Sequence, residues 1–440
     1  YDTIIPKILT NRFGMSQSLS GAIMALDNVL ALFLLPLFGS ISDKCKSKKG
    51  RRTPFIIAGT IAAAISFLAL SLTDNMQLSA ISKAVGDDRA SIETLYSADL
   101  TITTPGGETL SICDSFTLDE FASMAEKGSS ESQYTDFVLP AKAAYARAAV
   151  SVSNVPLILF IAVLLITLVS MATFRSPAVA LMPDVTIKPL RSKANAIINL
   201  MGAAGGIIVL AMGMIFKTGV PENTYMSYTV FFACISGLML ISLLIFIFNV
   251  NEPALVRDMQ AESRKYGLED GGGEDGSGDK RLSSGEKRSL ILILASVVFW
   301  YMGYNAVTSK YSVYAGSVLG LDYNLTLMIA TGSAILTYLP VGIVASKIGR
   351  KKTILAGVLI LASAFGAAGF MRAGSSPLLM NILFALAGIG WATINVNSFP
   401  MVVELATGSN VGKYTGIYYT ASMAAQTITP ILSGLFLDIK

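Results

Sequence analysis

Long apolar runs dominate the chain, and short polar segments separate them. An α-helix needs about 20 mostly apolar residues to cross a bilayer. Ten runs of this kind predict membrane-spanning helices near residues 16–41, 54–73, 155–182, 194–216, 228–250, 289–313, 323–345, 353–371, 377–400 and 414–436. The apolar positions are continuous and do not alternate with polar ones, which excludes a β-barrel. The expected fold class is therefore an all-α polytopic membrane protein.

Basic residues predict the side of the membrane on which each loop lies. Lys and Arg concentrate in the loops 42–53, 183–193, 251–288 and 346–352, whereas the short loops between them have almost none. The positive-inside rule places these four loops in the cytoplasm and Tyr1 on the opposite side.

Two longer polar segments are not predicted to span. Residues 251–288 include a Gly-rich acidic stretch at 271–279, which is typical of a flexible cytoplasmic linker. Residues 74–150 form a predicted extracytoplasmic insertion with five basic and twelve acidic residues. The sequence leaves open whether this insertion is a small folded cap or a loose loop, and a lineage-specific ornament is its simplest interpretation.

Composition supports the membrane class and excludes several kinds of chemistry. Hydrophobic residues make up 53% of the chain and charged residues only 14%, against about 25% charged in soluble domains. The absence of histidine excludes Ser-His-Asp catalysis and histidine metal sites. The three cysteines show no paired spacing, so we expect no disulfide, no metal and no cofactor. A net charge of +4 does not suggest nucleic acid as a partner.

The chain contains an internal repeat with an offset of 303 residues. The segment that begins at Gly39 recurs from Gly342, and each copy continues through a basic turn at Gly50 or Gly349. Because the span of the second copy is the sixth after the span of the first, the repeating unit is six helices.

The repeat also predicts what the chain lacks. Tyr1 aligns with Tyr304, inside the span 289–313, so we expect most of the first helix and all of the last to be missing from a twelve-span protein. The expected domains are an N-terminal helical half at 1–250, the linker at 251–288 and an incomplete C-terminal half at 289–440.

These residues resemble a known family, the major facilitator superfamily. The resemblance rests on two six-helix halves, a long middle loop, and the sequence GSISDKCKSKKGRR after the span 16–41, with a second copy, GIVASKIGRKK, in which Ser346 replaces the acid. Within the superfamily the chain is most similar to glycoside–cation symporters and sucrose transporters, through YDTIIP, FRSPAVALMPD and YNAVTSKYSVYA. It departs from them at Val179, where an arginine is expected and Arg175 lies one turn earlier, and at Ala31 and Leu35, where an aspartate pair is expected.

The resemblance implies a cytoplasmic gate that holds the two halves closed. Its acid, Asp43, is expected near a helix N-terminus of the other half, paired with arginine. Simple anchoring by positive charge would explain the Lys and Arg but neither Asp43 nor the glycines. The expected gate residues are Gly39, Asp43, Lys44, Gly50, Arg51, Arg52, Asp184, Lys347, Gly349, Arg350 and Glu404.

Polar and aromatic residues within the spans are the candidates for binding solute or ion. A lone carboxylate at mid-bilayer, as at Asp27, costs about 2.5–3.5 kcal/mol on insertion scales, so Asp27 is either an ion or sugar site or a structural contact. Arg175 is either the partner of an acid in the cavity or a side chain that snorkels to the cytoplasmic face. The full candidate set is Asp27, Asn28, Arg175, Tyr301, Tyr304, Asn305, Trp391, Asn395, Asn397 and Gln426.

The expected function is transport and not catalysis. We expect a monomeric plasma-membrane carrier that takes up a sugar or glycoside by alternating access, driven by protons or by sodium. No Walker motif is present, so ATP is not expected to supply the work. The alternatives are an exporter of drugs or other small metabolites and a membrane sensor that transports nothing.

Overall fold

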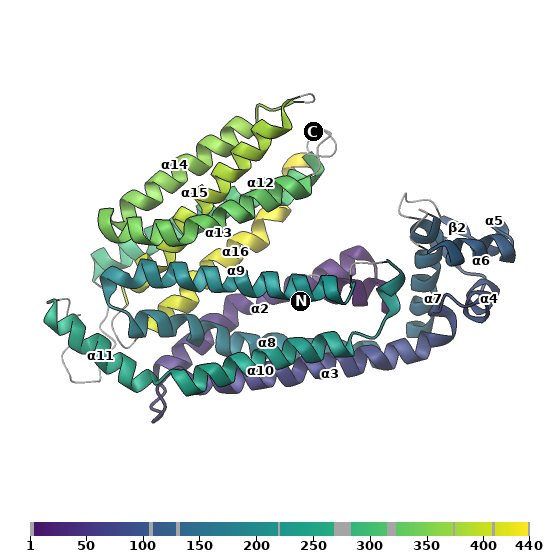
Figure 1. The fold of residues 1–440 in the computed structure, drawn as a ribbon, viewed down its shortest axis with the longest axis horizontal. Helices are drawn as coiled ribbons and strands as arrows, with labels where there is room; N and C mark the ends of the chain where they lie inside the picture. The colour runs from purple at the N-terminus through teal and green to yellow at the C-terminus, as the bar shows by residue number, and fades with distance from the viewer. Residues whose placement is uncertain are drawn as a thin grey trace. The chain divides into compact units, whose positions relative to one another are not determined.

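The computed structural model describes residues 4–104, 109–128, 133–218, 221–267, 283–314, 323–372, 375–406 and 410–438. Each predicted span corresponds to one long helix in Figure 1: α2 (Gln17–Asp43), α3 (Thr53–Val85), α8 (Val155–Val185), α9 (Arg191–Ile215), α10 (Thr229–Asn249), α12 (Ser284–Tyr314), α13 (Tyr323–Ile348), α14 (Arg350–Ala368), α15 (Pro377–Val403) and α16 (Val411–Asp438). Among the described residues, nine helices are long and apolar enough to cross a membrane. The tenth predicted span, 414–436, lies within α16.

The contacts divide the chain into two compact units. Unit 1 comprises residues 1–27, 60–171 and 207–244, and unit 2 comprises the remaining residues, 28–59, 172–206 and 245–440. This division cuts through five of the long helices and does not follow the predicted domain boundaries at 250 and 288. The two six-helix halves therefore stay a prediction, and Tyr1 lies outside the described residues.

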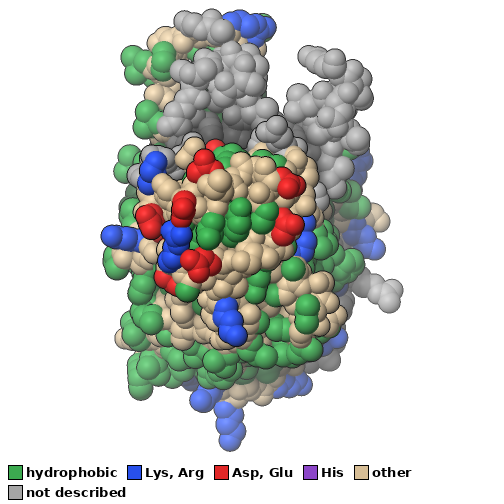
Figure 2. Space-filling model, turned by 90° about the vertical axis from the view of Figure 1, so that its right-hand side faces the viewer, with side chains coloured by type: hydrophobic (Ala, Val, Ile, Leu, Met, Phe, Trp, Pro, Cys, Tyr) green, Lys and Arg blue, Asp and Glu red, His purple; other side chains and the backbone are tan. Residues whose placement is uncertain are grey.

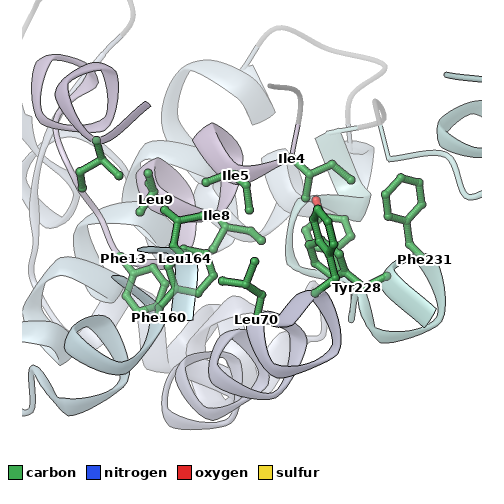
Figure 3. Close-up of a cluster of buried hydrophobic side chains, with 13 residues drawn as sticks. Ile4, Ile5, Ile8, Leu9, Phe13, Leu70, Phe160, Leu164, Tyr228 and Phe231 are labelled. Atoms are coloured by element: carbon green, nitrogen blue, oxygen red, sulfur yellow. The ribbon is translucent and has the colours of Figure 1, made fainter. Parts of the chain in front are cut away.

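The apolar core of unit 1 lies against the short first helix. Helix α1 (Ile5–Lys7) continues into the π-helix η1 (Ile8–Arg12), which buries Ile8 and Leu9 completely. Figure 3 shows these side chains meeting apolar residues from distant parts of the sequence. The described members of this core include Ile5, Ile8, Leu9, Phe13, Leu70, Phe160, Leu164 and Tyr228.

A buried ion pair joins the same first helix to α3. Arg12 and Asp74 are both fully buried, and the Arg12 guanidinium donates to the Asp74 carboxylate and to the carbonyl oxygens of Thr224 and Met226. The guanidinium also lies 4.4 Å from the centre of the Tyr228 ring. Because an unpaired buried charge is costly, this pair fixes the end of η1 against α3.

The insertion at 74–150 is a folded cap and not a loose loop. Helix α3 runs well beyond the predicted span, to Val85. The cap then consists of α4 (Arg89–Ser97), the antiparallel hairpin of β1 (Thr101–Thr103) and β2 (Thr109–Ser111), α5 (Ile112–Ser115), α6 (Leu118–Lys127), the π-helix η3 (Tyr134–Val138) and α7 (Leu139–Val152). Its elements enclose their own core, which includes Ile92, Leu95, Phe121, Tyr134 and Val138.

Local polar contacts explain where the elements of the cap begin and how they are joined. Thr117 and Glu120 form a reciprocal capping box at the start of α6. Lys142 of α7 is almost fully buried and donates 2.5 Å to the partly exposed carboxylate of Asp87. Burial lowers the pKa of Lys142, and the Asp87 charge opposes this shift. Figure 2 shows acidic and basic side chains together on the face that carries the cap, where Arg89 pairs with Glu93 and Asp119.

Part of the predicted linker is helical. Residues Glu252–Lys265 form α11, whose side chains are mostly exposed, except that Glu252 at its first position is buried. The expectation of a flexible linker therefore fails for this segment, and the Gly-rich stretch 271–279 lies outside the described residues. The reason is local: Asn251 caps the helix, Pro253 stands in its first turn, and Arg264 and Lys265 occupy its last turn.

In unit 2, helices α13, α14 and α15 lie side by side (Figure 1). Small residues permit the close approach, as expected of membrane helices. A side chain at Gly388 of α15 would overlap the backbone of Ala330 on α13. A Cβ atom at Gly390 of α15 would lie 3.0 Å from the carbonyl oxygen of Gly357 on α14.

The independent core of the cap yields a prediction for Phe121→Ala. Loss of a fully buried phenylalanine costs about 3–5 kcal/mol, so the cap should open more often. Hydrogen exchange of amides in 109–128 should become faster, while exchange in α12 to α15 stays unchanged. Phe370→Ala is the control, because that side chain is 84% exposed. Equal protection of the cap in both variants would contradict an independent core.

Candidate functional site

The turn before α3 depends on the backbone conformation of Gly50 and on the buried carboxylate of Glu252. Gly50 has φ +102°, a region that other residues rarely adopt, and a Cβ atom there would overlap the Glu252 side chain. The Glu252 carboxylate accepts hydrogen bonds from the backbone N–H groups of Arg51, Arg52 and Thr53, at 2.8–3.1 Å. It also accepts from the Thr53 hydroxyl at 2.7 Å. Glu252 thus satisfies the free donors at the start of α3 and complements its dipole.

Arg52 is the centre of a charged network that joins the ends of α2 and α8 to the start of α3. Its guanidinium is fully buried and donates to Asp184 at 2.8 Å, to Asp43 at 2.6 Å and to the Ser42 hydroxyl at 2.5 Å. Arg51 completes the network with two bonds to the Asp184 carboxylate, at 2.6 and 3.1 Å. Burial acts to lower the pKa of Arg52, but the Asp184 and Asp43 carboxylates outweigh it and the pKa is raised.

Asp43 links this network to the start of α16. One carboxylate oxygen accepts from the backbone N–H of Gly412 and the other from that of Lys413, both at 2.8 Å. These donors lie in the first turn of α16, where a carboxylate is favoured by the dipole of the helix. Gly39 and Gly412 allow the two helices to approach this closely, because a Cβ atom on either would overlap the backbone of the other. We name Asp43, Arg51, Arg52, Asp184 and Glu252 the first-copy network.

The repeated segment forms a related network at the start of α14. Gly349 has φ +91° and so matches Gly50. Arg350 pairs with Glu404 at the end of α15, as Arg51 pairs with Asp184 at the end of α8. Arg350 also donates 2.7 Å to the Ser192 hydroxyl in the first turn of α9, and 2.6 Å to the carbonyl oxygen of Lys188. We name Arg350, Glu404, Ser192 and Lys188 the second-copy network.

The second network has fewer charged groups than the first, and one difference lies at the position of Asp43. Where the first has Asp43 on the N-terminus of α16, the second has Ser346, whose hydroxyl donates to the Gly342 carbonyl oxygen of its own helix. Gly342 keeps the close approach, since a Cβ atom there would lie 2.8 Å from the Ala196 side chain of α9. Lys44 and Lys347, which the sequence groups with the gate, are both exposed.

The candidate aromatic residues gather around Trp391 on α15. Its ring centre lies 5.7 Å from that of Tyr304 and 6.5 Å from that of Trp300, both on α12. Tyr338 of α13 lies 6.1 Å away. The Trp300 indole nitrogen is buried and has no hydrogen-bond partner among the described residues. We name Trp300, Tyr304, Tyr338 and Trp391 the aromatic cluster.

Amide side chains continue from the aromatic cluster along α15. Asn395 donates 3.2 Å to the side-chain oxygen of Asn199 on α9 and accepts from the Tyr301 hydroxyl at 3.4 Å. Asn195, also on α9, donates 2.8 Å to the carbonyl oxygen of Val396. The structure therefore brings together Tyr301 and Asn395 of the predicted set and adds two asparagines of α9.

The other predicted candidates make contacts different from those of the aromatic cluster and its neighbouring amides. The side chains of Asn305, Asn397 and Gln426 bond to carbonyl oxygens of their own helices. The Arg175 guanidinium lies 5.4 Å from the centre of the Tyr419 ring of α16. Asp27 and Asn28 are both half-buried in α2. They fall on either side of the boundary between the two compact units.

Sequence reasoning missed several contributors, which are Glu252, Ser192, Lys188, Asn195, Asn199, Trp300 and Tyr338. Glu252 was hidden because it lies in a segment that was interpreted as a linker, although Asn251-Glu252-Pro253 is a recognisable helix start. Asn195 and Asn199 carried a signal, as two amides one turn apart on an apolar helix. Ser192 had none, since a serine in a first helical turn is ordinary.

These features define a class: a polytopic carrier whose two repeated segments join helix ends on the predicted cytoplasmic side. Comparison with known proteins identifies the family. Residues 141–430, more than half of the chain, match the family model described as Major Facilitator Superfamily. The chain belongs to this superfamily, and it is a multi-pass membrane transporter and not an enzyme.

Two further matches confirm the resemblance to the sugar-transporting branch. Residues 1–85 match a model described as MFS/sugar transport protein. The sucrose transport protein SUC4 of Arabidopsis thaliana is 40% identical over 57 residues, which are 13% of this chain and 11% of that protein. The alignment therefore spans only a small part of this relative.

Solved structures share the fold. The proton:xylose symporter XylE bound to 6-bromo-6-deoxy-D-glucose aligns with a TM-score of 0.52 and 15% identity, over 100% of this chain and 85% of that one. A bacterial homologue of the iron transporter ferroportin, in an outward-facing state, gives 0.55 and 14% over 99% and 87%. FucP in the outward conformation gives 0.50 and 12% over 100% and 93%. At these identities the likeness concerns the fold alone.

The first-copy network predicts a large effect of Asp184→Asn. The change leaves the buried Arg52 with one carboxylate in place of two, and breaking a buried pair costs about 3–5 kcal/mol. Thermal unfolding of the purified protein in detergent should show a clear fall in Tm. Arg89→Ala, which removes only exposed ion pairs, should leave the Tm almost unchanged. Similar Tm values for both variants would refute a stabilising role for the network.

Proposed function

We propose that the protein is a plasma-membrane carrier for uptake of a sugar or glycoside, driven by a proton gradient. The observation that carries the proposal is the aromatic cluster continued by amides on α15. Sugars present apolar C–H faces that pack on aromatic rings and hydroxyl groups that bond to amides. The matches to the sugar transport family model and to a sucrose transport protein support the same class of solute.

Alternating access supplies the mechanism of transport. The first-copy and second-copy networks join α2 to α16 and α9 to α14, so both must break before the cytoplasmic side opens. Rocking of one six-helix half against the other, around a central site, is the usual solution in such carriers. The solute and the ion shift the balance between the two states only by their difference in affinity for each.

Asp27 is proposed as the proton-carrying group. It is a half-buried carboxylate within a span, where a charge is expensive and protonation removes that cost. Arg175 is proposed to respond to it: its position against the Tyr419 ring, on α16, is compatible with a cation that exchanges partners as the halves move.

Proteoliposomes that contain the purified protein test the proposed function. We expect an inward pH gradient, with sucrose, maltose, melibiose or glucose added in turn, to produce proton entry with one of these sugars. The internal signal of a pH-sensitive dye measures this entry. The same sugars without the gradient serve as the control. Silence with all four sugars, both with and without sodium, would instead favour an exporter.

Asp27→Asn separates ion coupling from solute binding. The amide cannot carry the proton, so accumulation against a gradient should be lost. Exchange of labelled for unlabelled sugar across the membrane should remain, because it needs no net proton movement. Both activities are measured in the same vesicles, with Asn249→Ala as the control, because that exposed amide lies in another span and in neither candidate set. Unchanged accumulation in Asp27→Asn would mean that Asp27 is structural.

A further inference from the structure

A chain of uncharged side chains joins α9 to α12 and α15. Asn195 and Asn395 are only 4% and 9% exposed. The Asn395 amide donates to Asn199 on α9, and its oxygen accepts from Tyr301 on α12. Unlike the two charged networks, this contact consists entirely of groups that also suit the hydroxyls of a sugar.

The hydrogen bond between Asn395 and Asn199 exists only while α9 lies against α15. The Asn199 amide donates to its own helix, at the Asn195 carbonyl oxygen, and its side-chain oxygen accepts from Asn395. A buried amide without a partner costs about 1–3 kcal/mol. When α9 withdraws, the Asn395 amide nitrogen and the Asn199 side-chain oxygen therefore lose their partners at the same moment.

The position of Asn395 along α15 indicates at which step a solute would reach these amides. Asn395 follows Trp391 by four residues, so both lie on one face of the helix, about one turn or 5.4 Å apart. The predicted topology directs this end of α15 to the cytoplasm. A solute that leaves the aromatic cluster toward the cytoplasm meets Asn395 next.

We propose that Asn199, Asn395 and Tyr301 form a release site for a polyhydroxylated solute. With the cytoplasmic side closed, the amides bind each other and hold α9 to α15. Once α9 moves away, the same groups bind the hydroxyls of the departing solute. This inference rests on the proposed function, which it deepens by naming where the solute binds last.

The first arm of the test measures the closed contact without any solute. Ser176→Cys is the reporter in a background with Cys45, Cys113 and Cys234 changed to Ser, because Ser176 is fully buried and its hydroxyl has no partner among the described residues. In everted vesicles an impermeant maleimide reaches the reporter only when the cytoplasmic side opens. Asn199→Ala and Asn395→Ala should each speed labelling about three- to tenfold.

The double variant decides whether the two amides act together. Because each single change removes the same hydrogen bond, the double variant should label no faster than the faster single one. Asn249→Ala is the matched control, since that exposed amide donates to the Ile245 carbonyl oxygen of its own helix. Multiplicative effects in the double variant would overturn the contact.

The second arm separates a release site from a mere lock. The half-saturation concentration for sucrose is measured on the cytoplasmic side in everted vesicles and on the outer side in right-side-out vesicles. A lock alone, once broken, favours the inward-open state and lowers the cytoplasmic value. Loss of a release site raises that value, by about two- to tenfold for Asn199→Ala.

Each outcome bears on a different claim. A raised cytoplasmic value with faster labelling supports the release site, and a lowered value overturns it. If the unaltered protein transports neither sucrose nor the other three sugars, the proposed function fails and the release site fails with it. The labelling result would in that case still establish Asn199 and Asn395 as a contact between helices.

Discussion

The structure at the predicted cytoplasmic ends of α2 and α8 depends on the neutralisation of one buried guanidinium. Arg52 is fully buried, and water cannot screen its charge there. Two carboxylates, Asp43 and Asp184, compensate it, and each carboxylate is itself held by further donors. These ion pairs and hydrogen bonds connect the start of α3 to the ends of α8 and α2 and to the start of α16. The position of each helix end therefore depends on the others.

The internal repeat has preserved the geometry of this arrangement but not its charge. Gly50 and Gly349 both adopt a left-handed conformation, and each is followed by an arginine paired to an acid on another helix. Ser346 in place of an acid makes the second contact with α9 depend on Arg350 and neutral acceptors. The contact with α16 therefore has a charged acceptor and the contact with α9 a charged donor, so both consist of charge-assisted hydrogen bonds of opposite polarity.

Most of the fold was predictable from the sequence, since a continuous apolar run leaves the chain few alternatives in a bilayer. The fold of the insertion was not, because its core depends on contacts such as that of Phe121 with Tyr96, between elements with weak individual signals. At the site, Arg52 was predicted through the motif, and Asp184 as an acid after a proline at the end of another predicted helix. Glu252 was not, since a contact across 200 residues leaves no local pattern.

The capping of α3 by Glu252 also concerns biosynthesis. The backbone donors at Arg51 and Thr53 stay without this acceptor until the ribosome has added about 200 further residues. At about 5–20 residues per second, that delay is about 10–40 s. The start of α3 therefore cannot reach its final state as it emerges, and a chaperone or the insertion machinery has that interval in which to act on it.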